Sequence, residues 1–149
     1  MNEVPRISWR SVLTVLISYG VAAAVAGAAV LFLLDLSNLA QRGWSDWSYI
    51  FNWDWELVSI AIFITLVAGF VPFLGAIALL HAMRQTGWLA HILAGLAVSF
   101  VAQVIFFSDV LYPPFGADGT WPILAGGAIA GFVYWAIRPR LAAVFAPAP

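Results

Sequence analysis

The sequence predicts an all-α integral membrane protein, a four-transmembrane-helix bundle with both termini cytoplasmic. Its 149 residues are 64% hydrophobic and 9% charged, with a mean hydropathy of +0.98, whereas soluble domains are about 45–50% apolar and about 25% charged. Four long apolar runs carry no Asp, Glu, Lys or Arg, and five of the six arginines fall on one side of the membrane when these runs are taken as spans. A 16.1 kDa globule has too little interior to bury so many apolar side chains, so the bilayer must receive them.

The four apolar runs cover residues 11–34, 57–82, 88–108 and 121–137. At a rise of about 1.5 Å per residue, the first three reach about 30 Å or more, which is the thickness of the hydrocarbon core. The fourth reaches only about 25 Å and spans if Trp121 and Arg138 lie at the two interfaces. We therefore expect residues 1–149 to form a single transmembrane domain.

The arginines give the expected orientation. Arg6 and Arg10 precede the first run, Arg84 lies between the second and third, and Arg138 and Arg140 follow the fourth. Short loops that carry positive charge are retained in the cytoplasm. The sequence thus predicts a multi-pass protein of a bacterial-type inner (plasma) membrane, with its N and C termini cytoplasmic.

The loop between the first two runs, residues 35–56, is unusually aromatic. Its rings favour the membrane–water interface, where they anchor a chain. An aromatic belt at the membrane–water interface needs fewer rings than this loop supplies. Large aromatic side chains also dominate the hot spots of binding interfaces. We therefore expect this periplasmic or interfacial loop to contact lipid or a partner through Trp44, Trp47, Tyr49, Phe51, Trp53 and Trp55.

The second run contains Gly69, Pro72 and Gly75 near its middle. A proline inside a helix cannot donate to the carbonyl four residues earlier, so we expect a kink there. The run ends at the short segment 84–87, which predicts a tight turn and an antiparallel hairpin with the third run.

The third run carries a polar stripe, His91, Ser99 and Gln103, which recurs with Gly95 every four residues and so lies on one helix face. Polar groups are costly in hydrocarbon unless they are paired, so this stripe should face other helices or a cavity. Gln103 is expected to make either an interhelical hydrogen bond or a contact with a substrate or quinone.

Two histidines flank the hairpin at similar depth, His81 on the second run and His91 on the third. Facing histidines on neighbouring helices are what a bis-histidine haem b or half of a metal site requires. The alternative is that both are interfacial side chains with their polar tips in cytoplasmic water. We predict no bound cofactor, with haem b as the alternative.

The fourth run begins after Thr120, the expected N-cap, with Pro122 in the first turn, and we expect Pro139 to end it. Residues 139–149 would then form an apolar C-terminal tail. Small residues recur at helical spacing in three runs, and such stripes let helix backbones approach closely within the chain or between subunits. The glycines expected to serve packing are Gly20, Gly27, Gly95, Gly127 and Gly131.

Several function classes are disfavoured. A net charge of −1 without any Lys gives no basic stripe for nucleic acid. The sequence has no Ser–His–Asp set, phosphate loop or metal motif, so we do not expect an enzyme. Ionisable groups that couple transport to protons are absent from the four runs, apart from the two histidines.

The expected function is a small non-catalytic subunit or accessory protein of a larger inner-membrane complex. Its partners would be membrane lipids and other membrane-protein subunits, or a second copy through self-association. Two alternatives remain open. One is an oligomeric small transporter or channel for an uncharged or hydrophobic solute, and the other is a haem b or quinone-handling membrane subunit.

Overall fold

The structure, a computed structural model, describes residues 8–42, 54–107 and 120–144. These residues form four helices, α1 (Trp9–Arg42), α2 (Trp55–Ala82), α3 (Trp88–Phe107) and α4 (Thr120–Val144), and the described ranges contain no strand. Each helix is long and apolar enough to cross a membrane. The prediction of an all-helical chain with four candidate spans is therefore confirmed.

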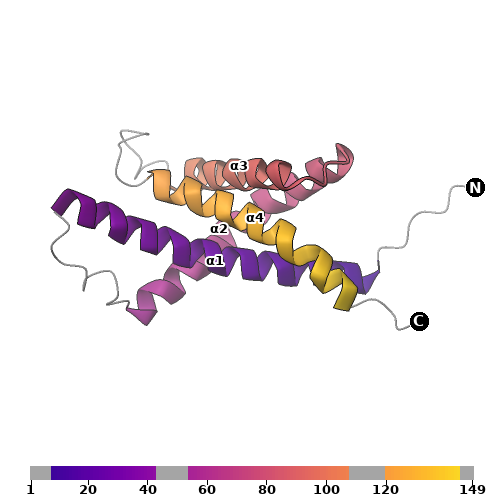
Figure 1. Ribbon diagram of the computed structural model, residues 1–149, viewed down its shortest axis with the longest axis horizontal. Helices are drawn as coiled ribbons and strands as arrows, with labels where there is room; N and C mark the ends of the chain where they lie inside the picture. The colour runs from indigo at the N-terminus through magenta and orange to yellow at the C-terminus, as the bar shows by residue number, and fades with distance from the viewer. Residues whose placement is uncertain (1–7, 43–53, 108–119, 145–149) are drawn as a thin grey trace, which may run out of the picture.

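The helices are arranged as a ring. Helix α1 packs against α2 and α4, and α3 packs against the same two helices. No described Cα atoms of α1 and α3, or of α2 and α4, come within 8 Å of each other. Figure 1 shows α4 between α1 and α3, with α2 passing obliquely behind them. The two diagonals of the bundle are thus open at the backbone level.

The α2–α3 turn is built on a left-handed residue. Arg84 has a φ of 53°, its N–H donates to the His81 carbonyl at 3.0 Å, and the N–H of Gln85 donates to the Leu80 carbonyl at 2.9 Å. This pair of bonds is a Schellman motif, which satisfies carbonyls that the end of α2 leaves open. The chain then re-enters a helix at Trp88, as the short hairpin predicts.

One end of the bundle gathers the start of α1, the α2–α3 turn and the end of α4 (Figure 1). Arg10, Arg84, Arg138 and Arg140 belong to these segments. The Trp135 indole N–H donates to the Thr86 carbonyl at 3.0 Å and so joins α4 to the turn. Four arginines expected to be cytoplasmic therefore share one end of the molecule.

Two helices are longer than the spans expected from the sequence. Helix α1 continues to Arg42, so residues 35–42 of the expected loop are helical. Asp35 ends the apolar run, but a charged side chain does not break a helix, and no Gly or Pro follows until Gly43. Hydropathy marks where a span leaves the membrane and does not mark where the helix ends.

Helix α4 runs through Pro139 to Val144, which corrects the expectation that this proline ends it. A proline removes one N–H donor and frees the carbonyl four residues earlier, that of Trp135. This position lies near the end of α4, where water or a local adjustment can satisfy the freed group. Residues 139–144 of the expected tail are thus helical, and residues 145–149 lie outside the described ranges.

Pro72 likewise lies inside a continuous α2. Of its two neighbouring glycines, Gly69 faces the Tyr19 hydroxyl, 3.1 Å from where a Cβ would lie, and Gly75 has no atom within 4 Å. A kink at this site stays a prediction.

Glycines bring α3 and α4 into backbone contact. A Cβ on Gly95 would collide with the Gly127 carbonyl oxygen, and one on Gly131 would collide with the His91 carbonyl oxygen. A Cβ on Gly127 would lie 2.5 Å from the Gly95 oxygen. These positions can accommodate only glycine at the present helix separation.

Helix α1 crosses its neighbours at two glycines. A Cβ on Gly27 would lie 2.9 Å from Ile62 Cα on α2, and one on Gly126 would lie 2.5 Å from Val30 Cγ2 on α1. Gly20, also expected to serve packing, has no atom within 4 Å of an added Cβ. Gly20 therefore makes no close helix contact within the described residues.

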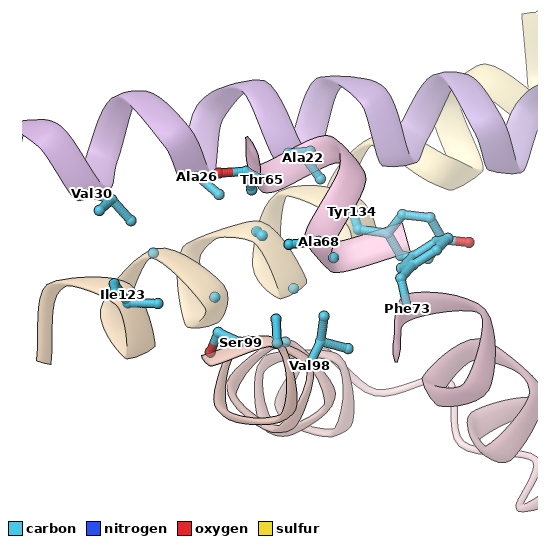
Figure 2. Close-up of a pocket in the computed structure, with 18 of the residues that line it drawn as sticks. Ala22, Ala26, Val30, Thr65, Ala68, Phe73, Val98, Ser99, Ile123 and Tyr134 are labelled. Atoms are coloured by element: carbon cyan, nitrogen blue, oxygen red, sulfur yellow. The ribbon is translucent and has the colours of Figure 1, made fainter. Parts of the chain in front are cut away.

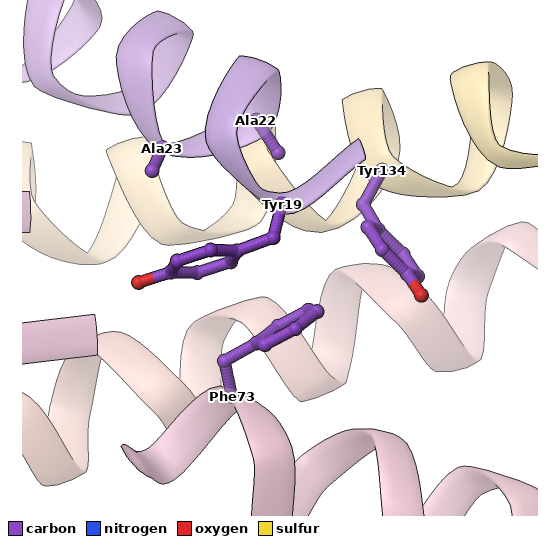
Figure 3. Packing of buried hydrophobic residues seen from close by; sticks show 5 residues of the cluster. All are labelled: Tyr19, Ala22, Ala23, Phe73 and Tyr134. Carbon is purple, nitrogen blue, oxygen red and sulfur yellow. The ribbon is translucent and has the colours of Figure 1, made fainter. Parts of the chain in front are cut away.

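An aromatic cluster packs three helices together (Figure 3). The Tyr19 ring of α1 stacks on Phe73 of α2 with a centroid distance of 4.3 Å, and Phe73 meets the edge of Tyr134 of α4 at 5.2 Å. The cluster also includes Ala22 and Ala23, which are 3% exposed. It fills the α2–α4 diagonal at this level with side chains.

Candidate ligand-binding cavity

A cavity of about 300 Å³ lies between the four helices, beside the aromatic cluster. All four helices line it, and Figure 2 shows side chains from each pointing toward the shared space. Alanines supply much of the wall, including Ala22 and Ala26 on α1 and Ala68 on α2. Their methyl groups are too short to fill the open diagonals, so space remains at the centre of the bundle.

Most polar groups in the wall are satisfied by backbone carbonyls. The Thr65 and Ser99 hydroxyls each donate to a carbonyl of their own helix, at 2.7 and 2.9 Å. The Tyr19 hydroxyl donates across the bundle to the Leu66 carbonyl at 2.7 Å. These groups present little free hydrogen-bonding capacity to the cavity.

Two polar atoms in the wall are buried without a partner. They are Nε2 of Gln103 and the hydroxyl of Tyr134, the unsatisfied buried side-chain nitrogen and oxygen atoms of the described residues. Gln103 is 2% exposed and Tyr134 is 3% exposed, and both line the cavity. Leaving a buried donor unpaired costs about 1–3 kcal/mol, so each group requires an explanation.

The two unpaired groups lie at opposite ends of the cavity. Tyr134 stacks on the His91 ring of α3 with a centroid distance of 6.0 Å. Gln103 lies twelve residues beyond His91 on the same helix, which corresponds to about 18 Å at the rise of an α-helix. The cavity is therefore long, with Gln103 at the end that the sequence predicts to be periplasmic.

The structure places the polar stripe of α3 along the cavity. His91, Ser99 and Gln103 all line it, as does Gly95. The His91 Nδ1 lies 2.9 Å from the Gly87 carbonyl oxygen. A carbonyl only accepts, so Nδ1 donates in this contact.

The two histidines occupy different environments. His91 is 6% exposed and lines the cavity, whereas His81 is exposed at the end of α2 and is not part of the wall. The described residues contain no group of three or more His, Asp or Glu side chains that could hold a metal ion.

The remaining site residues from the sequence lie elsewhere. Trp55, the first residue of α2, is 76% exposed, and Pro72 does not line the cavity. The other members of the aromatic loop, which are Trp44, Trp47, Tyr49, Phe51 and Trp53, lie outside the described residues.

Tyr134 was missed by sequence reasoning, although the sequence does carry a signal for it. It follows Gly127 and Gly131 at the spacing i, i+4, i+7, so the three residues share one helix face. Once the glycines are assigned to packing, a tyrosine on their face must point into the bundle, where its hydroxyl needs a partner.

No protein-family model matches this sequence, and no match was found among the curated proteins or the solved structures. The geometry of the cavity therefore carries the functional conclusion.

Proposed function

We propose that this protein binds a hydrophobic or uncharged molecule from the bilayer in its central cavity and acts as a small carrier or binding protein for it. The cavity itself is the observation that supports the proposal. Its volume of about 300 Å³ lies at the lower end of the range of ligand pockets, about 300–1,000 Å³. The described residues of its wall are mostly aliphatic and include no Asp, Glu, Lys or Arg.

The distribution of side-chain size supports a cavity that binds an apolar molecule. Small residues such as Ala23 and Ala26 face inward at 3% exposure, while Phe63 and Val71 face outward at 67% and 74%. Larger inward side chains would close the space at little chemical cost. An apolar occupant restores the dispersion contacts that the lining atoms lack on this side.

A membrane-embedded photolabel tests this proposal. The protein is reconstituted in lipid vesicles with an uncharged aryl diazirine, irradiated and mapped by mass spectrometry. We expect labelling of the inward face of α4, around Gly126 and Ala130, in addition to labelling of lipid-facing residues. Ala68→Leu fills part of the cavity and should reduce the inward labelling several-fold, because Ala68 lies in its wall.

The matched control is Ala78→Leu, the same change on an exposed face of α2 outside the cavity. It should leave the labelling pattern unchanged. Labelling confined to the lipid-facing residues of the unsubstituted protein would overturn the proposal.

A second candidate is the non-catalytic subunit of a larger inner-membrane complex. It is supported by Gly20, a small residue on α1 that packing within the described chain leaves unused. Close helix approach at such a position favours a contact with another helix. Co-purification under mild extraction tests it, since Gly20→Leu should release a partner chain or a second copy, and the absence of any such chain would contradict it.

A further inference from the structure

We propose that the occupant of the cavity is one acyl chain of an ester-linked membrane lipid, and that Gln103 donates its amide N–H to the ester carbonyl oxygen of that chain. This inference rests on the proposed binding function and specifies its ligand. Three features of the cavity point to it, which are its unpaired amide, its length and its elongated apolar wall.

The amide of Gln103 requires an acceptor. Its Nε2 is buried without a partner in the wall of the cavity. A charged acceptor would be costly at this depth, because none of the described residues that line the cavity is a Lys or Arg that could compensate it. A carbonyl oxygen is neutral and accepts without needing to donate, so it satisfies the amide and leaves no polar group of the ligand unpaired.

The length of the cavity matches one lipid tail. About 18 Å separates the level of Gln103 from that of Tyr134 along α3. The hydrocarbon core of a bilayer is about 30 Å thick, so one leaflet, and hence one tail, extends over about 15 Å. Gln103 lies four residues, about 6 Å, before the end of α3 at Phe107. This depth is close to where the ester carbonyls of that leaflet lie.

The cavity is elongated. A volume of about 300 Å³ is spread over about 18 Å along α3, a shape that an extended polymethylene chain fits. The wall between the ends is lined by Ala, Gly, Val and Ile side chains, which offer dispersion contacts along the chain.

Aromatic rings that already pack on one another form the inner part of the wall. Phe73 contacts both Tyr19 and Tyr134, and Tyr134 stacks on His91. The methyl end of an acyl chain can abut this cluster. In Figure 2 the Tyr134 hydroxyl points away from Ser99 and Ile123, so it is not offered to the chain.

A comparison of ester and ether lipids that have identical tails and headgroups isolates the contribution of the ester carbonyl to binding. The purified full-length protein is equilibrated with equal amounts of dipalmitoyl phosphatidylcholine and its dialkyl ether analogue, and bound lipid is counted by native mass spectrometry. One hydrogen bond worth about 1 kcal/mol corresponds to about a fivefold preference for the ester. We expect this preference in the unsubstituted protein.

Gln103→Leu removes the donor while keeping the volume and should reduce the ratio to about one. Gln103→Met serves the same purpose if the leucine variant does not fold. The matched control is Gln85→Leu, the same change at an exposed residue of the α2–α3 turn, which should keep the fivefold preference. Equal binding of ester and ether lipid by the unsubstituted protein would overturn the inference, and so would a preference that persists in the Gln103 variants.

The aryl-diazirine experiment keeps the two proposals distinguishable. Inward labelling together with equal ester and ether binding would leave the binding function standing and remove Gln103 as a carbonyl donor. Displacement of the ester lipid by a long-chain quinone in a Gln103-dependent manner would also overturn the acyl-chain assignment. Loss of inward labelling would remove both proposals.

Discussion

Tyr19, Tyr134 and Gln103 are polar side chains of the apolar interior whose hydrogen-bonding states differ. The Tyr19 hydroxyl has an acceptor in the Leu66 carbonyl at 2.7 Å, whereas Tyr134 and Gln103 have none. In a low-dielectric interior the unpaired groups are destabilising and the paired group is stabilising. The same chemical change at the two tyrosines should therefore have effects of different sign.

Tyr19→Phe should lower the free energy of unfolding by about 0.5–1.5 kcal/mol, because it removes the bond to α2 and leaves the carbonyl with one partner fewer. Tyr134→Phe should leave the free energy unchanged or raise it, because the hydroxyl that it removes is unpaired. Reversible unfolding of the two variants in mixed micelles measures both effects. A larger loss at Tyr134 than at Tyr19 would show that the Tyr134 hydroxyl has a partner in the folded protein.

Gln103→Leu belongs to the same comparison. In protein stripped of lipid, the variant should be more stable than the parent by about 1–2 kcal/mol, since an unpaired buried amide is replaced by an apolar group of similar size. In the presence of ester lipid the advantage should shrink, because the parent then pairs its amide. Unfolding measured with and without added lipid checks this, and equal differences in the two conditions would contradict it.

At the scale of elements, the glycines fall into two groups that the sequence does not distinguish. Gly95, Gly127 and Gly131 allow α3 and α4 to touch through their backbones, while Gly20 has open space beside it. The neighbours of Gly95 are backbone atoms, which cannot move aside as a flexible side chain can.

Gly95→Ala should therefore destabilise the protein by about 1–3 kcal/mol through overpacking. Gly20→Ala makes the same change on an open helix face and should stabilise it by about 0.5–1 kcal/mol, because alanine is the better helix former. Unfolding in mixed micelles gives both values. Similar effects at the two positions would mean that the α3–α4 separation differs from that described.

The α2–α3 turn offers a second prediction at this scale. Arg84 adopts a φ of 53°, a conformation that costs a residue with a side chain about 1–2 kcal/mol. Arg84→Gly should therefore raise the free energy of unfolding by about 1 kcal/mol. Gln85→Gly, at the next position, should give no gain, and a gain of equal size there would assign the effect to something other than the left-handed conformation.

At the scale of the whole molecule, the ends of the bundle differ in charge. The described Arg10, Arg84, Arg138 and Arg140 share the end that holds the α2–α3 turn, and Asp54 and Glu56 begin α2 at the opposite end. Short loops that carry positive charge are retained in the cytoplasm, so we expect the arginine end to be cytoplasmic.

The orientation can be measured with single cysteines, since the natural chain has none. Ser45→Cys and Gly116→Cys should react with a membrane-impermeant thiol reagent added to intact cells, and Gln85→Cys should react only after the membrane is permeabilised. Reaction at position 85 in intact cells, with position 45 silent, would reverse the orientation.

The sequence by itself determined that the chain forms four apolar helices, with a tight turn between the second and the third. Hydropathy, length and turn residues are local properties of a segment, so they can be recognised without the tertiary structure. It also singled out the face of α3 that carries Gln103, since a polar side chain in an apolar run is costly in hydrocarbon and is expected to face another helix or a cavity. It misplaced the ends of two helices, because hydropathy reports the membrane boundary and not the backbone hydrogen bonds that continue past it.

Only the tertiary structure decided what those helices enclose. The rotation of each helix and the distance between diagonally opposite helices decide whether Gly20 or Gly27 lies at a helix crossing. They also decide whether His81 lies near His91 and whether Gln103 has a hydrogen-bond partner. These quantities are set by close approach at Gly95, Gly126 and Gly127, which involves pairs of residues far apart in the chain. The cavity arises from that geometry, because four helices held together at their glycines leave the space between their alanines unfilled.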